Sequence, residues 1–107
     1  MDSRIQRIYS PMTESGFYIL FCLQTPQHGY GIGVQVKKMT GGAVTIGAGT
    51  MYGTLSKMEK DGLIEFYGEE ENRKLYKITG LGREVLTNEL KRIERIYKNS
   101  KGESFDA

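Results

Sequence analysis

Three segments of the chain carry apolar residues at the spacing expected of an α-helix. Residues 13–24 are apolar on most sides, which predicts a buried helix that Thr13 or Ser15 can cap. In residues 30–39 and 48–61 the apolar residues recur at intervals of three and four and so share one face of each helix. They are Ile32, Val36 and Met39 in the second helix, and Met51, Leu55 and Met58 in the third.

A β-hairpin is expected directly after the third helix. Gly62 follows Asp61 at a point where a helix needs a residue that tolerates positive φ, so the helix should end there. Residues 63–67 and 74–78 are rich in aromatic and branched residues at alternating positions, which predicts two strands. The polar residues 68–73 between them fit the loop of the hairpin.

A long helix is expected near the end of the chain, from residue 81 to residue 100, with Thr79 as its cap. Its apolar residues Leu86, Leu90, Ile93 and Tyr97 are spaced four, three and four apart, which is the heptad pattern through which helices pair. One small domain offers this helix little to bury against, so we expect it to pair with the same helix of a second copy.

The two ends of the chain have weaker patterns. Residues 1–10 contain Ile5, Ile8 and Tyr9 among arginines, which fits either a flexible segment or a short helix that lies against a partner. Pro11 separates this segment from the first predicted helix. Residues 101–107 are expected to form a disordered tail.

These elements describe a winged helix-turn-helix in residues 11–80 followed by a dimerisation helix in residues 81–100. The fold class is α+β and mainly helical, with a wing of two or three strands. The third strand is expected at residues 43–46, which are partly β-branched, and Gly47 should be the N-cap of the next helix.

Composition narrows the function without deciding it. A chain of 107 residues makes one domain, and its net charge of +2 neither requires nor excludes nucleic acid. The single cysteine, Cys22, rules out an internal disulfide framework. No segment is long and apolar enough to span a membrane and no signal-peptide pattern is present, so we expect a cytoplasmic protein.

The outer face of the third helix points to DNA as a partner. Around the apolar stripe lie residues that are small, hydroxylic or cationic, which allow close approach to a groove and contact with phosphates. An adaptor that keeps the winged fold but binds a protein is the alternative, supported by the low net charge and by the acidic residues 69–71. The sequence does not support an enzymatic function, because no nucleophile with a base, paired carboxylates or metal cluster can be recognised.

Four segments of the chain resemble the PadR-like transcriptional regulators, in their compact form with a single C-terminal helix. They read HGYGI at residues 28–32, GTMYGTL at residues 49–55, MEKDGLI at residues 58–64 and RKLYKIT at residues 73–79, the last followed by Gly82 and Arg83. They occur in the family's order and spacing, and the resemblance covers about residues 12–97. Each motif is weak alone, whereas four in register are specific.

The resemblance implies a winged-helix dimer, formed through the first and last helices, that acts chiefly as a repressor on a palindromic operator. It also implies that the third helix enters the major groove and that the wing touches the backbone. Family members often carry proline at the position of Gly53 and a polar cap at that of Gly47, so the start of this helix is less constrained here. Some compact relatives bind planar drugs through tryptophan, which this chain lacks, and a small-molecule effector stays an open question.

The candidate DNA contacts lie on the second helix, the third helix and the wing. They are Tyr30, Lys37, Lys38, Thr50, Tyr52, Gly53, Thr54, Lys57, Arg73 and Lys74. A solvated helix face is the simpler alternative for the lysines, and Tyr52 fits either a phosphate contact or packing beneath the wing. Glu69, Glu70 and Glu71 would repel phosphates, so we expect the wing tip to stay away from DNA and its acids to pair with Arg73 and Lys74.

The candidate dimer contacts are the heptad residues together with part of an aromatic cluster in the first helix. They are Phe17, Phe21, Leu86, Leu90, Ile93 and Tyr97, although Phe17, Tyr18 and Phe21 also fit a simple core role.

We expect no metal and no cofactor. The single histidine, His28, fits a structural role at a turn, and one histidine with one cysteine cannot complete a zinc site. Cys22 is expected to be an inert buried thiol. The glycines at positions 29, 31 and 33 resemble a phosphate loop, but neither a preceding strand nor a lysine-serine pair accompanies them.

Overall fold

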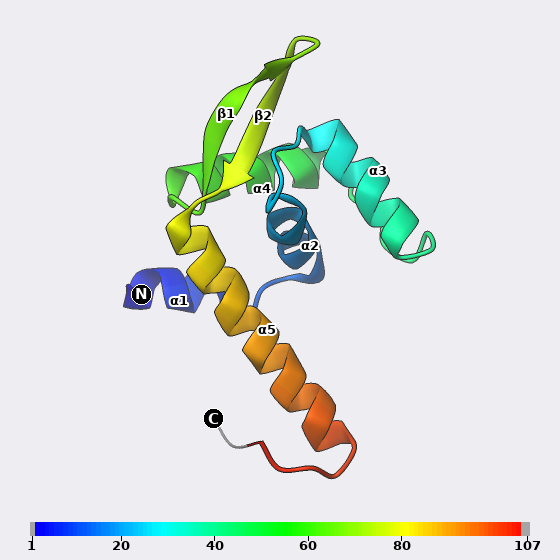
Figure 1. Cartoon of the computed structure of the whole chain (residues 1–107), viewed down its shortest axis with the longest axis vertical. Coiled ribbons are helices and arrows are strands. Elements are labelled where there is room, and N and C mark those ends of the chain that lie inside the picture. Colours follow the sequence, from blue (N-terminus) through cyan, green and yellow to red (C-terminus); the bar gives the residue numbers. More distant parts are fainter. Residues whose placement is uncertain (1, 106–107) are drawn as a thin grey trace.

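The computed structural model describes residues 2–105, which form five helices and one antiparallel hairpin. The order is α1 (Ser3–Tyr9), α2 (Glu14–Cys22), α3 (Gly29–Met39), α4 (Ala48–Lys60), β1 (Ile64–Glu70), β2 (Arg73–Ile78) and α5 (Gly80–Ser100). Helix α2 lies at the centre with α3 and α4 against it, the hairpin projects from one end, and the far half of α5 extends away from the other elements (Figure 1). This is the winged helix-turn-helix that the sequence predicts.

The helices begin at side chains that the sequence makes available as caps. Thr13 Oγ1 accepts a hydrogen bond from the backbone N–H of Gly16 at 3.0 Å, and Thr79 Oγ1 accepts one from that of Gly82 at 3.1 Å. Gly47 is the N-cap of α4, as expected, and provides no side-chain bond. Gly62 has φ of +81°, which ends α4 at the predicted position.

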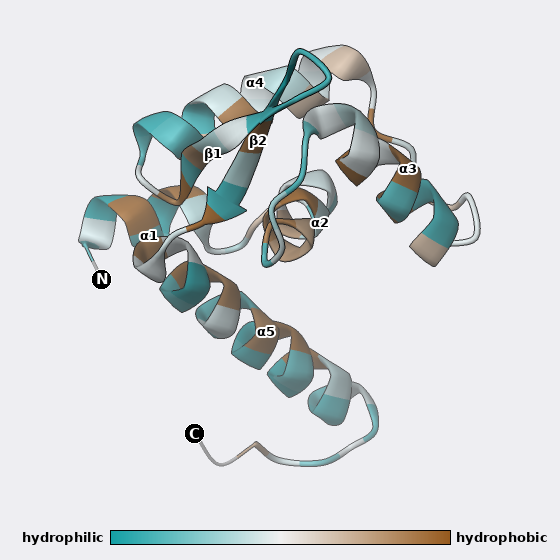
Figure 2. Ribbon diagram, turned by 45° about the horizontal axis from the view of Figure 1, so that its top comes forward, coloured by the Kyte–Doolittle hydropathy of each residue, from teal (hydrophilic) through white to brown (hydrophobic). Residues whose placement is uncertain are grey.

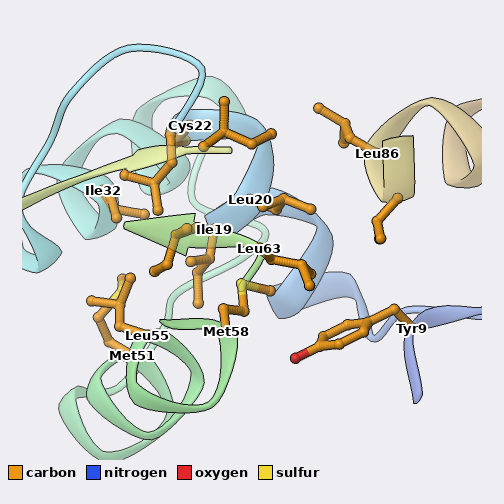
Figure 3. Packing of buried hydrophobic residues seen from close by; sticks show 14 of the residues in the cluster. Tyr9, Ile19, Leu20, Cys22, Ile32, Met51, Leu55, Met58, Leu63 and Leu86 are labelled. Carbon is orange, nitrogen blue, oxygen red and sulfur yellow. The ribbon is translucent and has the colours of Figure 1, made fainter. Parts of the chain in front are cut away.

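The core gathers around α2. Ile19, Leu20 and Leu23 are fully buried. Ile19 lies among Ile32 of α3 and the apolar side chains of α4 (Figure 3). In α4 the stripe is Met51, Leu55 and Met58, all of which are buried as their spacing predicts.

The hairpin has a two-residue turn, so its strands are longer than the sequence suggests. The sequence predicts a loop at residues 68–73, but β1 continues to Glu70 and β2 begins at Arg73. Glu71 and Asn72 have φ of 52° and 63°, the left-handed pair that closes a type I′ turn. The register shifts between Phe66 and Gly68, where a bulge leaves Tyr67 without a partner across the ladder.

The prediction of a third strand at residues 43–46 is wrong. The sheet of the described residues has two strands, and the bridge on its free edge comes from Gln27, whose N–H donates to Tyr76 O at 3.1 Å. Residues 43–46 instead follow a turn at two glycines with positive φ, and the N–H of Val44 donates to Thr40 Oγ1 at 3.1 Å. The side-chain cap of Thr40 therefore keeps this segment beside α3.

The two ends of the described chain are held by different contacts. The first ten residues contain helix α1, and Ile5 and Tyr9 from it are buried in the core. After α5 the chain turns at Gly102, whose φ is +80°, and Asn99 Nδ2 donates to Glu103 O at 2.8 Å. Residues 106 and 107 of the expected tail lie outside the described residues.

Candidate nucleic-acid interface

The face of α4 opposite the core is exposed and almost free of bulk. Gly49 and Gly53 lie four residues apart on it, and a Cβ added at either would meet no atom within 4 Å. Thr50 and Lys57 are exposed on the same side, and Thr54 is half-buried at its edge. Packing within the chain therefore does not require glycine at either position. Glycine within a helix also costs about 1 kcal/mol relative to alanine, so helix stability does not account for these glycines either.

Two tyrosines mark the start of this face. Tyr30 and Tyr52 are both more than half exposed. The ring of Tyr52 lies against Gly29, where an added Cβ would come within 2.8 Å of Tyr52 Cε1. Gly29 therefore allows the first turn of α3 to approach α4 and fixes the position of the tyrosine ring.

Arg73 at the end of the wing is held over the start of α3. Its guanidinium carbon lies 4.8 Å from the centre of the Tyr30 ring, and that ring stacks on His28 at 6.4 Å. His28 is also the N-cap of α3, because its Nδ1 accepts a hydrogen bond from the N–H of Gly31 at 3.0 Å. The structure thus joins Arg73 and Tyr30, and it gives His28 the structural role that the sequence indicated.

A groove of about 360 Å³ runs between α3 and the start of α4 and brings several candidates together. Tyr30 and Tyr52 line it along with Lys37, over a floor that includes Ile46 and Met51. Lys38 is exposed but does not line the groove, and Lys74 is exposed on the wing away from it.

The acidic residues of the wing tip stand opposite basic ones across the hairpin. Glu70 pairs with Arg73 in the register, and Glu69 with Lys74. Within residues 2–105, however, no ion pair joins these glutamates to either cation, and Arg73 turns to Tyr30 instead. The structure therefore does not contain the expected ion pairs at the tip.

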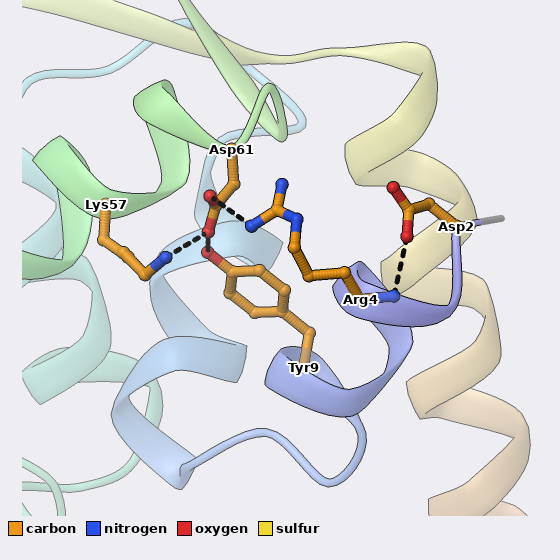
Figure 4. Close-up of polar contacts among 5 residues, drawn as sticks. All are labelled: Asp2, Arg4, Tyr9, Lys57 and Asp61. Carbon is orange, nitrogen blue, oxygen red and sulfur yellow. Dashed lines mark hydrogen bonds and ion pairs between the residues drawn. The ribbon is translucent and has the colours of Figure 1, made fainter.

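Lys57 is paired with a buried carboxylate that sequence reasoning missed. Lys57 Nζ lies 2.8 Å from Asp61 Oδ2, and the side chain of Asp61 is only 3% exposed. The Tyr9 hydroxyl donates to the same Oδ2 at 2.7 Å, and Arg4 Nη1 lies 3.4 Å from Oδ1 (Figure 4). The spacing of four between Lys57 and Asp61 was a visible signal, but nothing in the sequence brings α1 to this site.

These donors decide the charge of Asp61. Burial acts to raise the pKa of its carboxyl group, but the hydrogen bonds from Lys57, Tyr9 and Arg4 together outweigh burial and hold this pKa below its ordinary value. Burial and the neighbouring carboxylate raise the pKa of Tyr9, so its hydroxyl stays protonated and remains a donor.

A second buried carboxylate, also missed from the sequence, ties the linker after α1 to α5. Glu89 is 1% exposed, and its Oε1 accepts from the N–H of Met12 at 2.8 Å and from Arg92 Nη2 at 2.7 Å. Burial acts to raise the pKa of Glu89, but the bonds from Arg92 and Met12 lower it overall. The segment from Arg4 to Met12 is therefore held by one buried carboxylate on each side.

The expected dimer residues divide into buried and exposed groups. Leu86 is buried in its own subunit, and Phe17 and Phe21, whose rings stack at 5.9 Å, are half-buried against the same core. Farther along α5 the apolar side chains Leu90, Ile93, Ile96 and Tyr97 are between 41% and 62% exposed. Ile96 extends the predicted stripe, and the stripe runs along one side of α5 (Figure 2).

Other chemistry is sparse in the described part of the chain. Residues 2–105 contain no cluster of three or more side chains that could hold a metal ion. Cys22 is buried, and burial raises the pKa of its thiol, which makes the thiolate less accessible. None of the helices in this part is long and apolar enough to cross a membrane.

Comparison with known proteins places these features in a family. A transcriptional regulator from Clostridium thermocellum is 26% identical, with a TM-score of 0.73 over 95% of this chain and 96% of its own. Bacillus subtilis PadR in complex with operator DNA is 25% identical, with a TM-score of 0.63 over 73% of this chain and 47% of its own.

A PadR-like regulator from Bacillus cereus, 24% identical, shares the fold with a TM-score of 0.69 over 82% of this chain and 88% of its own. Comparison with curated protein sequences finds no match. The model of the transcriptional regulator PadR-like family matches residues 19–88, and the chain belongs to this family.

Proposed function

We propose that this DNA-binding transcriptional regulator is a homodimeric, cytoplasmic repressor that inserts α4 into the major groove of a palindromic operator. The observation that carries the proposal is the outer face of α4, where two glycines and two threonines lie beside Lys57 and Tyr52 stands at one edge. The solved complex of Bacillus subtilis PadR with operator DNA supports the same use of the fold here.

The candidate residues beside α4 fit contacts with the phosphates that border the major groove of DNA. Tyr30, Lys37 and Tyr52 line one hollow at the start of α4, so their polar ends are able to reach the same stretch of backbone. Arg73 is held beside them by Tyr30 and would let the wing touch the backbone, whereas the glutamates of the tip would repel phosphates.

The exposed stripe of α5 supports the dimer. Four large apolar side chains on the free half of one helix are costly to leave in water, at about 25 cal/mol per Å² of apolar surface. Pairing with the same stripe of a second copy would bury them and would set two α4 helices for major grooves about 34 Å apart.

The test is binding to the DNA upstream of the protein's own coding region across a salt series. We expect a footprint over a two-fold symmetric site. Lys57→Ala should weaken this binding roughly tenfold and lower the slope of log affinity against log salt by about 0.9, because one phosphate contact is lost. Lys91→Ala, which changes an exposed lysine on α5, is the matched control. Sequence-independent binding alone, both there and in DNA selected from random sequences, would contradict the proposal.

An adaptor that binds a protein through the wing is the second candidate. The exposed acidic tip favours it, because Glu69, Glu70 and Glu71 carry three charges with no ion pair to Arg73 or Lys74 among the described residues. It predicts that the chain binds no operator at physiological salt.

A further inference from the structure

Asp61 connects the outer face of α4 to helix α1. Its carboxylate has three donors, and two of them, Tyr9 and Arg4, come from α1. Tyr9 is buried and cannot move without opening the core, whereas the side chain of Lys57 is 50% exposed. Lys57 can therefore leave Asp61 more easily than Tyr9 can, and of the three donors it is the one that comes from α4 itself.

Lys57 also borders the surface that would receive DNA. It lines a shallow hollow of about 270 Å³ together with Gly53 and Thr54 of α4 and Thr13 at the start of α2. A phosphate at this hollow would compete with Asp61 for the ammonium group. In the free protein Lys57 is bound to Asp61, since its Nζ lies 2.8 Å from Asp61 Oδ2.

The cost of releasing Lys57 depends on what remains bound to Asp61. A buried carboxylate that loses all of its donors is strongly destabilised, whereas a carboxylate that keeps other donors loses much less. With α1 in place, the Tyr9 hydroxyl still donates at 2.7 Å and Arg4 still supplies a positive charge at 3.4 Å. Without them, Lys57 would be the last donor and would be held.

We propose that α1 makes Lys57 available to DNA: Tyr9 and Arg4 keep Asp61 satisfied, so that Lys57 can exchange this carboxylate for a backbone phosphate. Tyr9 and Arg4 are thus positioning residues for DNA binding, although neither touches DNA. The inference rests on the proposed function, since it assumes that α4 binds an operator.

The test compares operator binding by the full chain across a salt series for four variants. Lys57→Met should lower the salt slope by about 0.9. Tyr9→Phe keeps the ring but removes the hydroxyl, and it should lower the slope in the same way and weaken binding several-fold, because Lys57 stays on Asp61. Adding Tyr9→Phe to Lys57→Met should weaken binding no further. Asp61→Asn should keep the full slope, because Lys57 is then free.

Two further variants separate this role from a general loss of structure. Tyr18→Phe is the matched control, since Tyr18 is half-buried on α2 and its ring contacts Phe17 rather than a carboxylate. Arg4→Met changes a side chain that is 55% exposed, so it should leave the fold intact even if Tyr9→Phe does not. It should also lower the salt slope. Thermal unfolding and sedimentation would report the fold and the dimer of each variant.

The outcomes distinguish failure of the inference from failure of the proposed function. If the wild-type chain binds no specific DNA, the proposed function fails and the inference fails with it. If the wild-type chain binds but Lys57→Met leaves the slope unchanged, only the inference is overturned. The same holds if Tyr9→Phe and Arg4→Met bind as the wild type does, or if Tyr9→Phe weakens binding equally with and without Lys57.

Discussion

At the scale of single residues, two glycines differ in whether packing requires the absence of a side chain. Gly82 faces the backbone of Leu63, and an added Cβ would lie 2.1 Å from its carbonyl oxygen. Gly53 faces open space. Both lie in helices, so the intrinsic helix propensity is the same and only the surroundings differ.

Alanine at these two positions should therefore have opposite effects on stability. Gly53→Ala should raise the free energy of unfolding by roughly 0.5–1 kcal/mol through helix propensity, and it should weaken operator binding because the added methyl group meets the groove. Gly82→Ala should lower the stability by more than 2 kcal/mol, roughly, through the clash with Leu63. Urea unfolding measures both, and equal effects at the two sites would contradict the assignment.

At the scale of elements, the sequence predicts the helices and their caps but not how the first helix is held. Periodicity and the residues at the helix ends depend on neighbours within four positions, which is why α2, α4 and Thr79 could be located. The contacts of Asp61 with Tyr9 and of Glu89 with Met12 join residues 52 and 77 positions apart. No local pattern encodes such pairs, so the two buried carboxylates were missed.

The same limit explains the errors in the sheet. A short β-branched segment was expected to pair with the hairpin, but Thr40 caps it and Gln27 takes the place on the sheet edge. Residue type and the family resemblance identified Tyr30 and Arg73 as two separate candidates. The contact between them depends on the position of the wing relative to α3, which the sequence does not give. Which candidates act together was thus not predictable.

Attachment of α1 should be sensitive to acid. The pKa values of Asp61 and Glu89 are lowered in the folded state, so the unfolded chain binds more protons as the pH falls. Their stabilisation is therefore present above their ordinary pKa values of 3.8 and 4.5 and is lost below them, as the pH passes through the lowered values. Urea unfolding from pH 6 to pH 2.5 should show this loss.

Asp61→Asn is the variant that tests the assignment. It removes the titrating group, so it should lower stability near neutral pH and flatten the decline below pH 4, roughly. Glu65→Gln is the control, because Glu65 is exposed and lies 3.7 Å from Lys77 in a surface pair. An unchanged decline in Asp61→Asn would show that Asp61 does not contribute to it.

At the scale of the whole molecule, the surface that we propose for DNA and the exposed apolar surface lie on different elements. The small face of α4 lies near the wing, and the free half of α5 extends away from it (Figure 1). Segment 4–12 bridges the two, since Asp61 holds it to α4 and Glu89 holds it to α5. A dimer formed through α5 would therefore govern both the distance between two α4 helices and the docking of α1.

The dimer itself makes the last prediction. Leu90→Asp together with Ile93→Asp puts two charges into the stripe, and burying them against a partner would cost several kcal/mol. Sedimentation should then show a monomer that keeps its helical content, because both side chains are more than 40% exposed in the single subunit. Operator binding should become far weaker, since one half-site is bound at a time.

The matched control is Thr87→Asp with Lys91→Asp, two exposed positions on another side of the same helix. This pair adds the same side chains and removes one positive charge, yet it should leave the dimer intact because it spares the stripe. A dimer that survives the Leu90 and Ile93 changes would mean that the stripe faces water or a different partner. In that case α5 would not set the spacing of the α4 helices, and the two half-sites of the operator would need another explanation.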